Sequence, residues 1–158
     1  MTATAQRPEW WRDEFRSLDG LPLLPCGAGP SKKAPFPSNW QNLRFSLDEV
    51  MAYPGVRCIG TRCGPDAGGI LFGDYDGLSA SKFAADNFPR DPNEPDSWII
   101  GRENNPNRYK EAFYVPQDRW DQCVGKTVLP TGEGEQLEFF FGTGQVIGAG
   151  QHVSSGGE

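Results

Sequence analysis

Two aspartates at the end of one short segment are the residues in this sequence best placed to do chemistry. Asp74 and Asp76 close the segment 69–76, in which apolar residues precede the acids. If this segment is a β-strand, the two acids share one face with Ile70 and Phe72, because side chains alternate along a strand. Adjacent carboxylates repel each other unless a cation binds, and oxygen ligands suit Mg²⁺ or Mn²⁺. The pair therefore predicts a divalent-cation site; the alternative is a plain turn, since Asp-Gly is a common turn dipeptide.

A third acid, Glu138, stands alone inside the apolar segment 136–141. On a strand it shares a face with Phe140, while its immediate neighbours face the other way. A charge is rarely buried unless it is paired or binds a metal. Beside the two aspartates, Glu138 would complete a two-metal site, in which ions ~3.5–4 Å apart clamp a phosphoryl displacement. The alternative is a half-exposed glutamate on an edge strand.

Four basic residues could hold the phosphates of a ligand beside such a site. Arg102 and Arg108 lie in the loop expected between two strands, and Lys110 begins the second of them. Arginine binds phosphate by paired hydrogen bonds, and lysine binds it as a point charge. His152 lies in the glycine-rich segment 148–157, where glycine lets the backbone approach a ligand closely, and could contact a phosphate or a sugar. The alternatives are a solvated basic loop and a structural histidine.

The composition excludes several other functions. With one histidine, the chain cannot build a histidine-rich zinc site or the HExxH motif of metalloproteases. It has neither the ~20 consecutive apolar residues of a membrane-spanning helix nor an N-terminal signal peptide, so we expect a cytoplasmic protein with no membrane partner. The four cysteines lack CxxC spacing and are expected to be buried as small apolar residues. A net charge of −6 argues against a protein held to nucleic acid by its whole surface.

The elements that must position these residues form an α+β fold. A length of 158 residues corresponds to about one domain, and 20 glycines with 14 prolines predict many loops. Ser46 and Glu49 form the capping box of a short helix, and Gly142 with Gly144 suggests a hairpin between the last two strands. The late strands are expected to be antiparallel. We expect helices over 9–17, 46–53 and 79–88, a helical turn over 116–124, and strands over 21–26, 56–61, 69–76, 97–100, 110–115, 126–129, 135–141 and 145–150.

Four segments, taken in order, resemble the prim-pol domain of bifunctional DNA primase/polymerases, in the archaeo-eukaryotic primase superfamily. The segment LPLLPCGAGPSKKAPFPSNWQ resembles the opening strand and basic loop of the family. The segment IGTRCGPDAGGILFGDYDG resembles the family's "G-x-R-x-G" motif and its metal-binding "D-h-D" strand, where h is an apolar residue. The segment IIGRENNPNRYKEAFYV resembles the family's basic second motif, but it lacks the histidine that many members of the family carry there. The segment QLEFFFGTGQVIGAGQHVSSGGE resembles the acid of the family's third motif and the glycine-rich motif that follows it. The similarity runs from about Leu21 to the end of the chain.

This resemblance implies a function, a fold and roles for individual residues. Asp74, Asp76 and Glu138 would hold two Mg²⁺ or Mn²⁺ ions and catalyse template-directed nucleotidyl transfer from (d)NTPs onto DNA, with single-stranded DNA as template. The nucleotide would be bound by Arg102, Arg108, Lys110 and His152. The implied fold is a prim-pol core, with an RRM-like mixed or antiparallel sheet flanked by short helices. Residues 1–20 would be a helical extension, and residues 21–158 the catalytic part of a longer replication protein with a helicase-type C-terminal domain or partner.

Three other functions remain open from the sequence. A metal-dependent nuclease could use the same three acids, although such sites often carry a lysine two residues after the last acid, where this chain has Phe140. A non-catalytic nucleotide-binding module of a replication protein is the second alternative. A hydrolase built on His152 and Ser154 or Ser155 is the third, but these residues lack the strand–turn–helix context of a nucleophile elbow.

Overall fold

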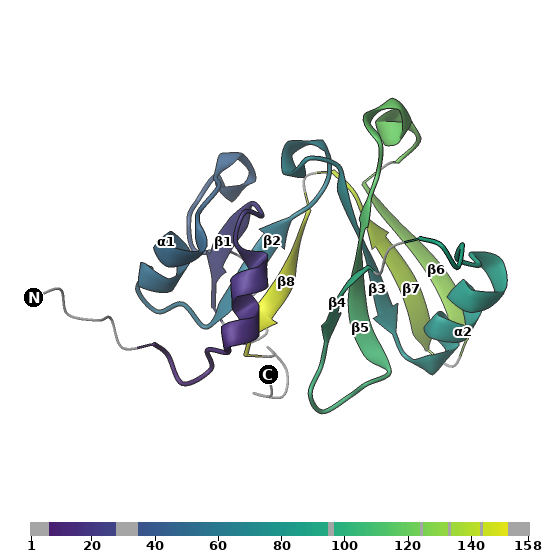
Figure 1. Cartoon of the computed structure of the whole chain (residues 1–158), viewed down its shortest axis with the longest axis horizontal. Helices are drawn as coiled ribbons and strands as arrows, with labels where there is room; N and C mark the ends of the chain where they lie inside the picture. Colours follow the sequence, from purple (N-terminus) through teal and green to yellow (C-terminus); the bar gives the residue numbers. More distant parts are fainter. Residues whose placement is uncertain are drawn as a thin grey trace, which may run out of the picture. The chain divides into compact units, whose positions relative to one another are not determined.

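The computed structural model describes residues 7–27, 35–94, 97–123, 125–132, 134–142 and 144–151. It divides into two compact units, one formed by Met1–Thr61 with Ile147–Glu158 and the other by Arg62–Val146. Two separate sheets and few helices make the fold α+β, as predicted (Figure 1). No helix in the described residues is both long and apolar enough to cross a membrane.

The first unit is built on a three-stranded sheet in the order β1-β2-β8. Its β1 and β2 pair antiparallel, and Cys26 lies opposite Cys58. Buried Leu24, Cys26 and Cys58 form the core of this sheet, against which Trp40, Phe45 and other partly buried residues pack. The elements are η1 (Asp13–Leu18), β1 (Leu23–Cys26), η2 (Trp40–Asn42), α1 (Leu47–Ala52), β2 (Cys58–Arg62) and β8 (Gln145–Gly150).

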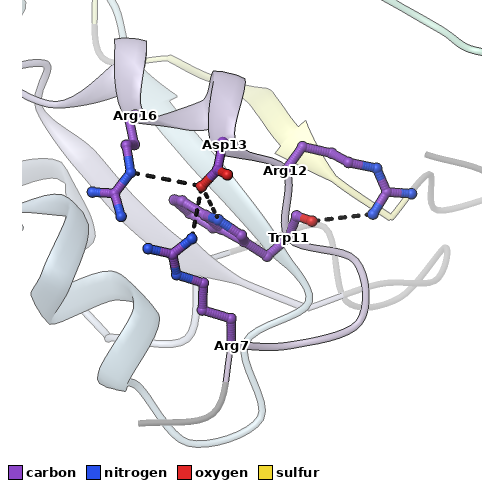
Figure 2. A network of polar contacts seen from close by, with 5 residues as sticks. All are labelled: Arg7, Trp11, Arg12, Asp13 and Arg16. Atoms are coloured by element: carbon purple, nitrogen blue, oxygen red, sulfur yellow. Dashed lines mark hydrogen bonds and ion pairs between the residues drawn. The ribbon is translucent and has the colours of Figure 1, made fainter. Parts of the chain in front are cut away.

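The predicted helix over 9–17 is instead a short 3-10 helix, η1, that begins at Asp13. Its first turn is held by side chains: the Asp13 carboxylate pairs with Arg7 at 2.7 Å and with Arg16 at 3.7 Å, and it accepts a hydrogen bond from the Trp11 indole (Figure 2). The hydrogen bond from Trp11 and the charge of Arg7 lower the pKa of Asp13. A helix of six residues is too short to be stable by itself, so these side-chain contacts support η1.

The capping box predicted for α1 is confirmed. The Ser46 hydroxyl accepts a hydrogen bond from the backbone N–H of Glu49, and the Glu49 carboxylate accepts one from the backbone N–H of Ser46 at 2.8 Å. The bonds from Ser46 lower the pKa of Glu49, since they stabilise its charged form.

The second unit is built on a five-stranded antiparallel sheet in the order β4-β5-β3-β7-β6. Helix α2 lies along β6 and β7 (Figure 1) and packs on the face that carries Tyr75 and Leu137. Strands β3 and β7 are therefore interior strands, each with a neighbour on both sides. The elements are η3 (Pro65–Ala67), β3 (Ile70–Asp76), α2 (Leu78–Asn87), β4 (Trp98–Gly101), β5 (Arg108–Tyr114), η4 (Gln117–Gln122), β6 (Lys126–Gly132) and β7 (Glu135–Phe140).

Helix α2 is capped from a distant strand. The residue before it, Gly77, has no side chain to cap with, and the Glu135 carboxylate of β7 accepts the backbone N–H of Ser79 at 2.7 Å instead. Hydrogen bonds from the Ser79 hydroxyl and backbone lower the pKa of Glu135. A Cβ at position 77 would displace this carboxylate, and the φ of +134° disfavours any residue with a side chain, so both favour glycine there.

The predicted hairpin between the last two strands is wrong. Strand β7 pairs with β3 and β6, so both of its edges are occupied, and β8 joins β2 in the other sheet. The hairpin in this region is formed by β6 and β7, which meet around Gly132 and Gly134, both with positive φ. The sequence between β7 and β8 is therefore a connection between sheets.

The prediction that the cysteines are buried is confirmed for Cys26, Cys58 and Cys63, while Cys123 is partly exposed. Burial raises the pKa of Cys26 to about 12, and that of Cys58 and Cys63 to about 11 each. At pH 8 these three thiols are protonated and shielded from solvent, and the thiolate is the reactive form. We expect a thiol reagent such as DTNB to label one cysteine of the native protein quickly and all four after denaturation. Two or more fast-reacting thiols in the native protein would contradict this burial.

Candidate active site

The three acids predicted from the sequence lie on one face of the five-stranded sheet. On β3, Asp74 and Asp76 point to the same side, and the register places Asp74 directly opposite Glu138 of β7. Side chains directly opposite on antiparallel strands have Cβ atoms about 4.5–5.5 Å apart. The alternation expected for β3 is confirmed, and β7 is an interior strand, so the alternative of an edge-strand glutamate is wrong.

Each aspartate has a cation opposite it on β5. The register pairs Asp74 with Lys110 and Asp76 with Arg108. The Lys110 Nζ lies 3.5 Å from the Asp74 carboxylate, and the Arg108 Nε lies 3.1 Å from that of Asp76. Arg108 was expected in a loop, but it is the first residue of β5 because its backbone pairs with Asp76. The strand therefore fixes both cations beside the acids.

The third acid is held by a cation from the opposite side. Lys126, at the start of β6, places its Nζ 2.7 Å from Oε1 of Glu138, and the Gln136 amide donates to the same oxygen at 2.8 Å. The Glu138 side chain is only 13% exposed, whereas that of Lys126 is 50% exposed. Across the sheet, β5 therefore carries cations, the next strands β3 and β7 carry the acids, and β6 carries a cation again. We call these seven side chains the charged face: Asp74, Asp76, Arg108, Lys110, Lys126, Gln136 and Glu138.

Apolar residues on the same side of the sheet form a rigid base beside the charged face. Phe72 is fully buried and packs in one cluster with Cys63 and Val146, joined by Phe140 and Ile100. Because Phe72 precedes Asp74 and Phe140 follows Glu138 at a spacing of two residues, the packed rings fix where the acids emerge.

The remaining predicted ligands are not assembled with this group. Arg102 directly follows β4, and within the described residues its guanidinium forms no ion pair with the acids of the charged face. His152 lies outside the described residues. Lys126 was missed as a site residue, although it was expected in a strand. Its place becomes visible only from the β6–β7 register, which puts it opposite Phe140 and diagonal to Glu138.

A second polar cluster supports the same strands from the side covered by α2. Glu111 of β5 is 2% exposed; its carboxylate accepts a hydrogen bond from the Tyr75 hydroxyl at 3.0 Å and forms an ion pair with Arg90. Burial raises the pKa of Tyr75, whose ring stacks on Tyr109 at 4.3 Å between centroids. Tyr75 lies between the two aspartates in sequence, so this cluster ties β3 to β5 directly behind the charged face.

Removing the partner of the buried Glu111 is expected to destabilise the fold. Arg90→Met leaves a buried carboxylate without its cation, and we expect it to lower the free energy of unfolding by roughly 2–4 kcal/mol, since Arg90 is itself half exposed. Glu111→Gln removes the charge and keeps an acceptor for Tyr75, so about 1 kcal/mol is expected. Urea unfolding of both variants and of the double variant measures this, and the double variant should be more stable than Arg90→Met alone. Equal losses for the two single variants would contradict this account.

The charged face has the donor chemistry of a divalent-cation site, because three carboxylates of two adjacent strands offer hard oxygen ligands. In the arrangement described, each carboxylate is paired with an ammonium or guanidinium group. Among the described residues, no three histidine, cysteine, aspartate or glutamate side chains already stand in a group that could hold an ion. The three carboxylates fit such an ion if Arg108, Lys110 and Lys126 move away from them.

No family model, curated protein or solved structure matches the chain at a significant level, which leaves the charged face as the guide to its function.

Proposed function

We propose that this chain is a metal-dependent nucleotidyltransferase domain of the DNA primase/polymerase type. It would transfer nucleotides from (d)NTPs onto DNA, directed by a single-stranded DNA template, with two Mg²⁺ or Mn²⁺ ions as cofactors. The observation that carries the proposal is the charged face: three carboxylates on two interior strands, flanked on both sides by cations. The antiparallel sheet, with α2 on its other face, is compatible with the RRM-like core that the resemblance implies.

The acids would hold the cofactor. Asp74, Asp76 and Glu138 supply the oxygen ligands, and the packed Phe72 beside them limits their movement. Bound there, the two ions would increase the nucleophilicity of a primer 3′-hydroxyl and stabilise the charge on the departing pyrophosphate.

The basic residues of β5 would bind the nucleotide. Arg108 presents a planar fork of donors that matches a phosphate group, and it is 40% exposed. Lys110 is 17% exposed and adds a point charge at the next position of the same face. Both would orient the triphosphate toward the acids, which places the reacting phosphorus beside the carboxylates.

A metal-dependent nuclease is the second candidate, and one contact favours it. Such sites often carry a lysine beside the last acid, and Lys126 lies 2.7 Å from Glu138 although position 140 is a phenylalanine. The two functions differ in substrate: a nuclease shortens DNA without any nucleotide, whereas a polymerase lengthens it and consumes (d)NTPs.

The test is one assay on single-stranded DNA, with and without a primer, with dNTPs or NTPs, in Mn²⁺, Mg²⁺ or EDTA. We expect metal-dependent products longer than the primer, and products in the unprimed reaction would establish priming. Asp74→Asn/Asp76→Asn is the inactive control, and Asp118→Asn, a 79% exposed acid on η4, is the matched active control. Shortened DNA in the absence of nucleotides would favour the nuclease. If the wild-type protein produces neither result, both proposals are wrong.

A further inference from the structure

Lys126 differs from the other cations of the charged face in where it stands. It begins β6, an edge strand, and its side chain reaches diagonally over the sheet to Glu138 of the interior strand β7. Its ammonium also lies 5.1 Å from the centre of the Phe140 ring. A half-exposed lysine is thus held over a nearly buried acid by two contacts.

Among the described residues, Glu138 is the acid that pairs with Lys126, and it is also a proposed metal ligand. An ammonium group at 2.7 Å occupies Oε1, and a divalent cation at the same carboxylate would repel it. In the described part of the chain, the hydrogen bond and the ion pair of Glu138 both use Oε1, which leaves Oε2 as the oxygen at which a cation would first bind.

We propose that Lys126 is a phosphate-binding residue that is released from Glu138 when a divalent cation binds there. The inference rests on the proposed function and extends it: the ligand is a metal–polyphosphate complex, as in a nucleoside triphosphate. The phosphates lie between the displaced ammonium and the cation, and they neutralise both. The cation and the polyphosphate therefore bind cooperatively, because each alone must break an ion pair that the other would replace.

The arrangement of the charged face favours a chain of phosphates over a single one. Arg108 and Lys110 lie on β5, whereas Lys126 lies on β6, with both acid-bearing strands between them. Adjacent strands are about 4.8 Å apart, so the two groups of cations arise from backbones separated by about 14 Å. A ligand that contacts cations of both groups needs several phosphates, as tripolyphosphate provides.

The experiment measures binding without catalysis. Free Mn²⁺ is counted by electron paramagnetic resonance in titrations of the protein, and tripolyphosphate binding is measured by calorimetry with saturating Mn²⁺ or with EDTA. For the wild type we expect tripolyphosphate to bind about 10-fold more tightly with Mn²⁺ than without it. For Lys126→Gln we expect about 10-fold tighter binding of Mn²⁺ alone and about 10-fold weaker binding of tripolyphosphate with Mn²⁺.

Two further variants separate the specific contact from a change in charge. Lys82→Gln removes an exposed lysine from α2 and should leave both affinities within about 2-fold of wild type. Lys126→Arg keeps the charge and should keep the Mn²⁺ affinity near that of wild type. Unfolding curves establish that each variant is folded.

The outcomes distinguish this inference from the proposed function. Unchanged or weaker Mn²⁺ binding by Lys126→Gln, or unchanged binding of tripolyphosphate, overturns the inference even if the wild type extends primers. Calorimetry with a single-stranded oligonucleotide that lacks a terminal phosphate completes the test. If Lys126→Gln loses affinity for this DNA and not for tripolyphosphate, Lys126 contacts nucleic acid and the inference is overturned. The two opposite shifts in a protein that makes no product would support the inference and reject the polymerase.

Discussion

Asp74→Asn/Asp76→Asn is expected to lower the rate of the proposed nucleotidyl transfer by about 100-fold or more while the protein stays folded. Asparagine keeps the shape of the side chain and one oxygen, but it removes the negative charge that would hold a divalent cation in the proposed site. Removing one electrostatic group that acts in the transition state commonly costs 100- to 1,000-fold, and under the proposed function this variant removes two. The measurement is single-turnover primer extension at saturating Mn²⁺, compared with wild type.

The stability of this variant is expected to change little. The ion pairs to Lys110 and Arg108 are partly exposed cross-strand contacts, each worth about 0.2–1 kcal/mol. A cooperative unfolding curve shifted by no more than about 2 kcal/mol would therefore accompany the loss of activity. Equal activity of the variant and the wild type would mean that these carboxylates take no part in the reaction.

Gly64→Ala is expected to lower the free energy of unfolding by roughly 4 kcal/mol or more. A Cβ at this position would overlap the backbone N, O and Cα of Gly142, with the Cα only 2.6 Å away. Backbone atoms cannot rotate aside as a side chain can, so the strand β7 that ends just before Gly142 would have to shift. The φ of +89° adds strain for any residue with a Cβ. Urea unfolding or soluble expression measures the effect.

Gly68→Ala is the matched control for this prediction. Gly68 lies in the same loop and also has a positive φ of +72°, but a Cβ there would meet nothing within 4 Å. Only the backbone strain remains, and about 1 kcal/mol is expected. Similar losses of unfolding free energy in the two variants would show that the close approach of Gly142 does not make position 64 intolerant of a Cβ.

The alternation of residues predicted the placement of the acids better than it predicted the topology. The pattern of Ile70, Phe72, Asp74 and Asp76 was sufficient to place both acids on one face, because a strand fixes the direction of every second side chain. An isolated charge in an apolar strand predicted Glu138 as a third acid, and the register places it opposite Asp74. The first prediction depends on local backbone geometry, which a single segment determines, whereas the place of Glu138 beside Asp74 depends on the pairing of β3 with β7.

The errors concern pairing between segments. The glycines at 142 and 144 suggested a hairpin, but Gly142 instead allows the close approach of Gly64 where the chain leaves the sheet. Lys126 carries no local signal, since its relation to Glu138 arises from a register set by the turn at Gly132 and Gly134. Local composition does not reveal which strands pair with each other. The wrong hairpin at 142–144 and the missed Lys126 both depend on this pairing.

The direct pairing of Asp74 with Glu138 also bears on when the site can exist during folding. These residues are partners across β3 and β7 although 64 positions separate them in the chain, the difference between their numbers. Closing so long a loop costs entropy before the contacts of the sheet compensate for it, and non-local strand pairing is slow for this reason. On a ribosome, β3 would emerge and pair with β5 well before β7 was synthesised. The two aspartates would then be exposed for a time beside Lys110 and Arg108 without their third acid, and a chain ending before residue 135 would never acquire it.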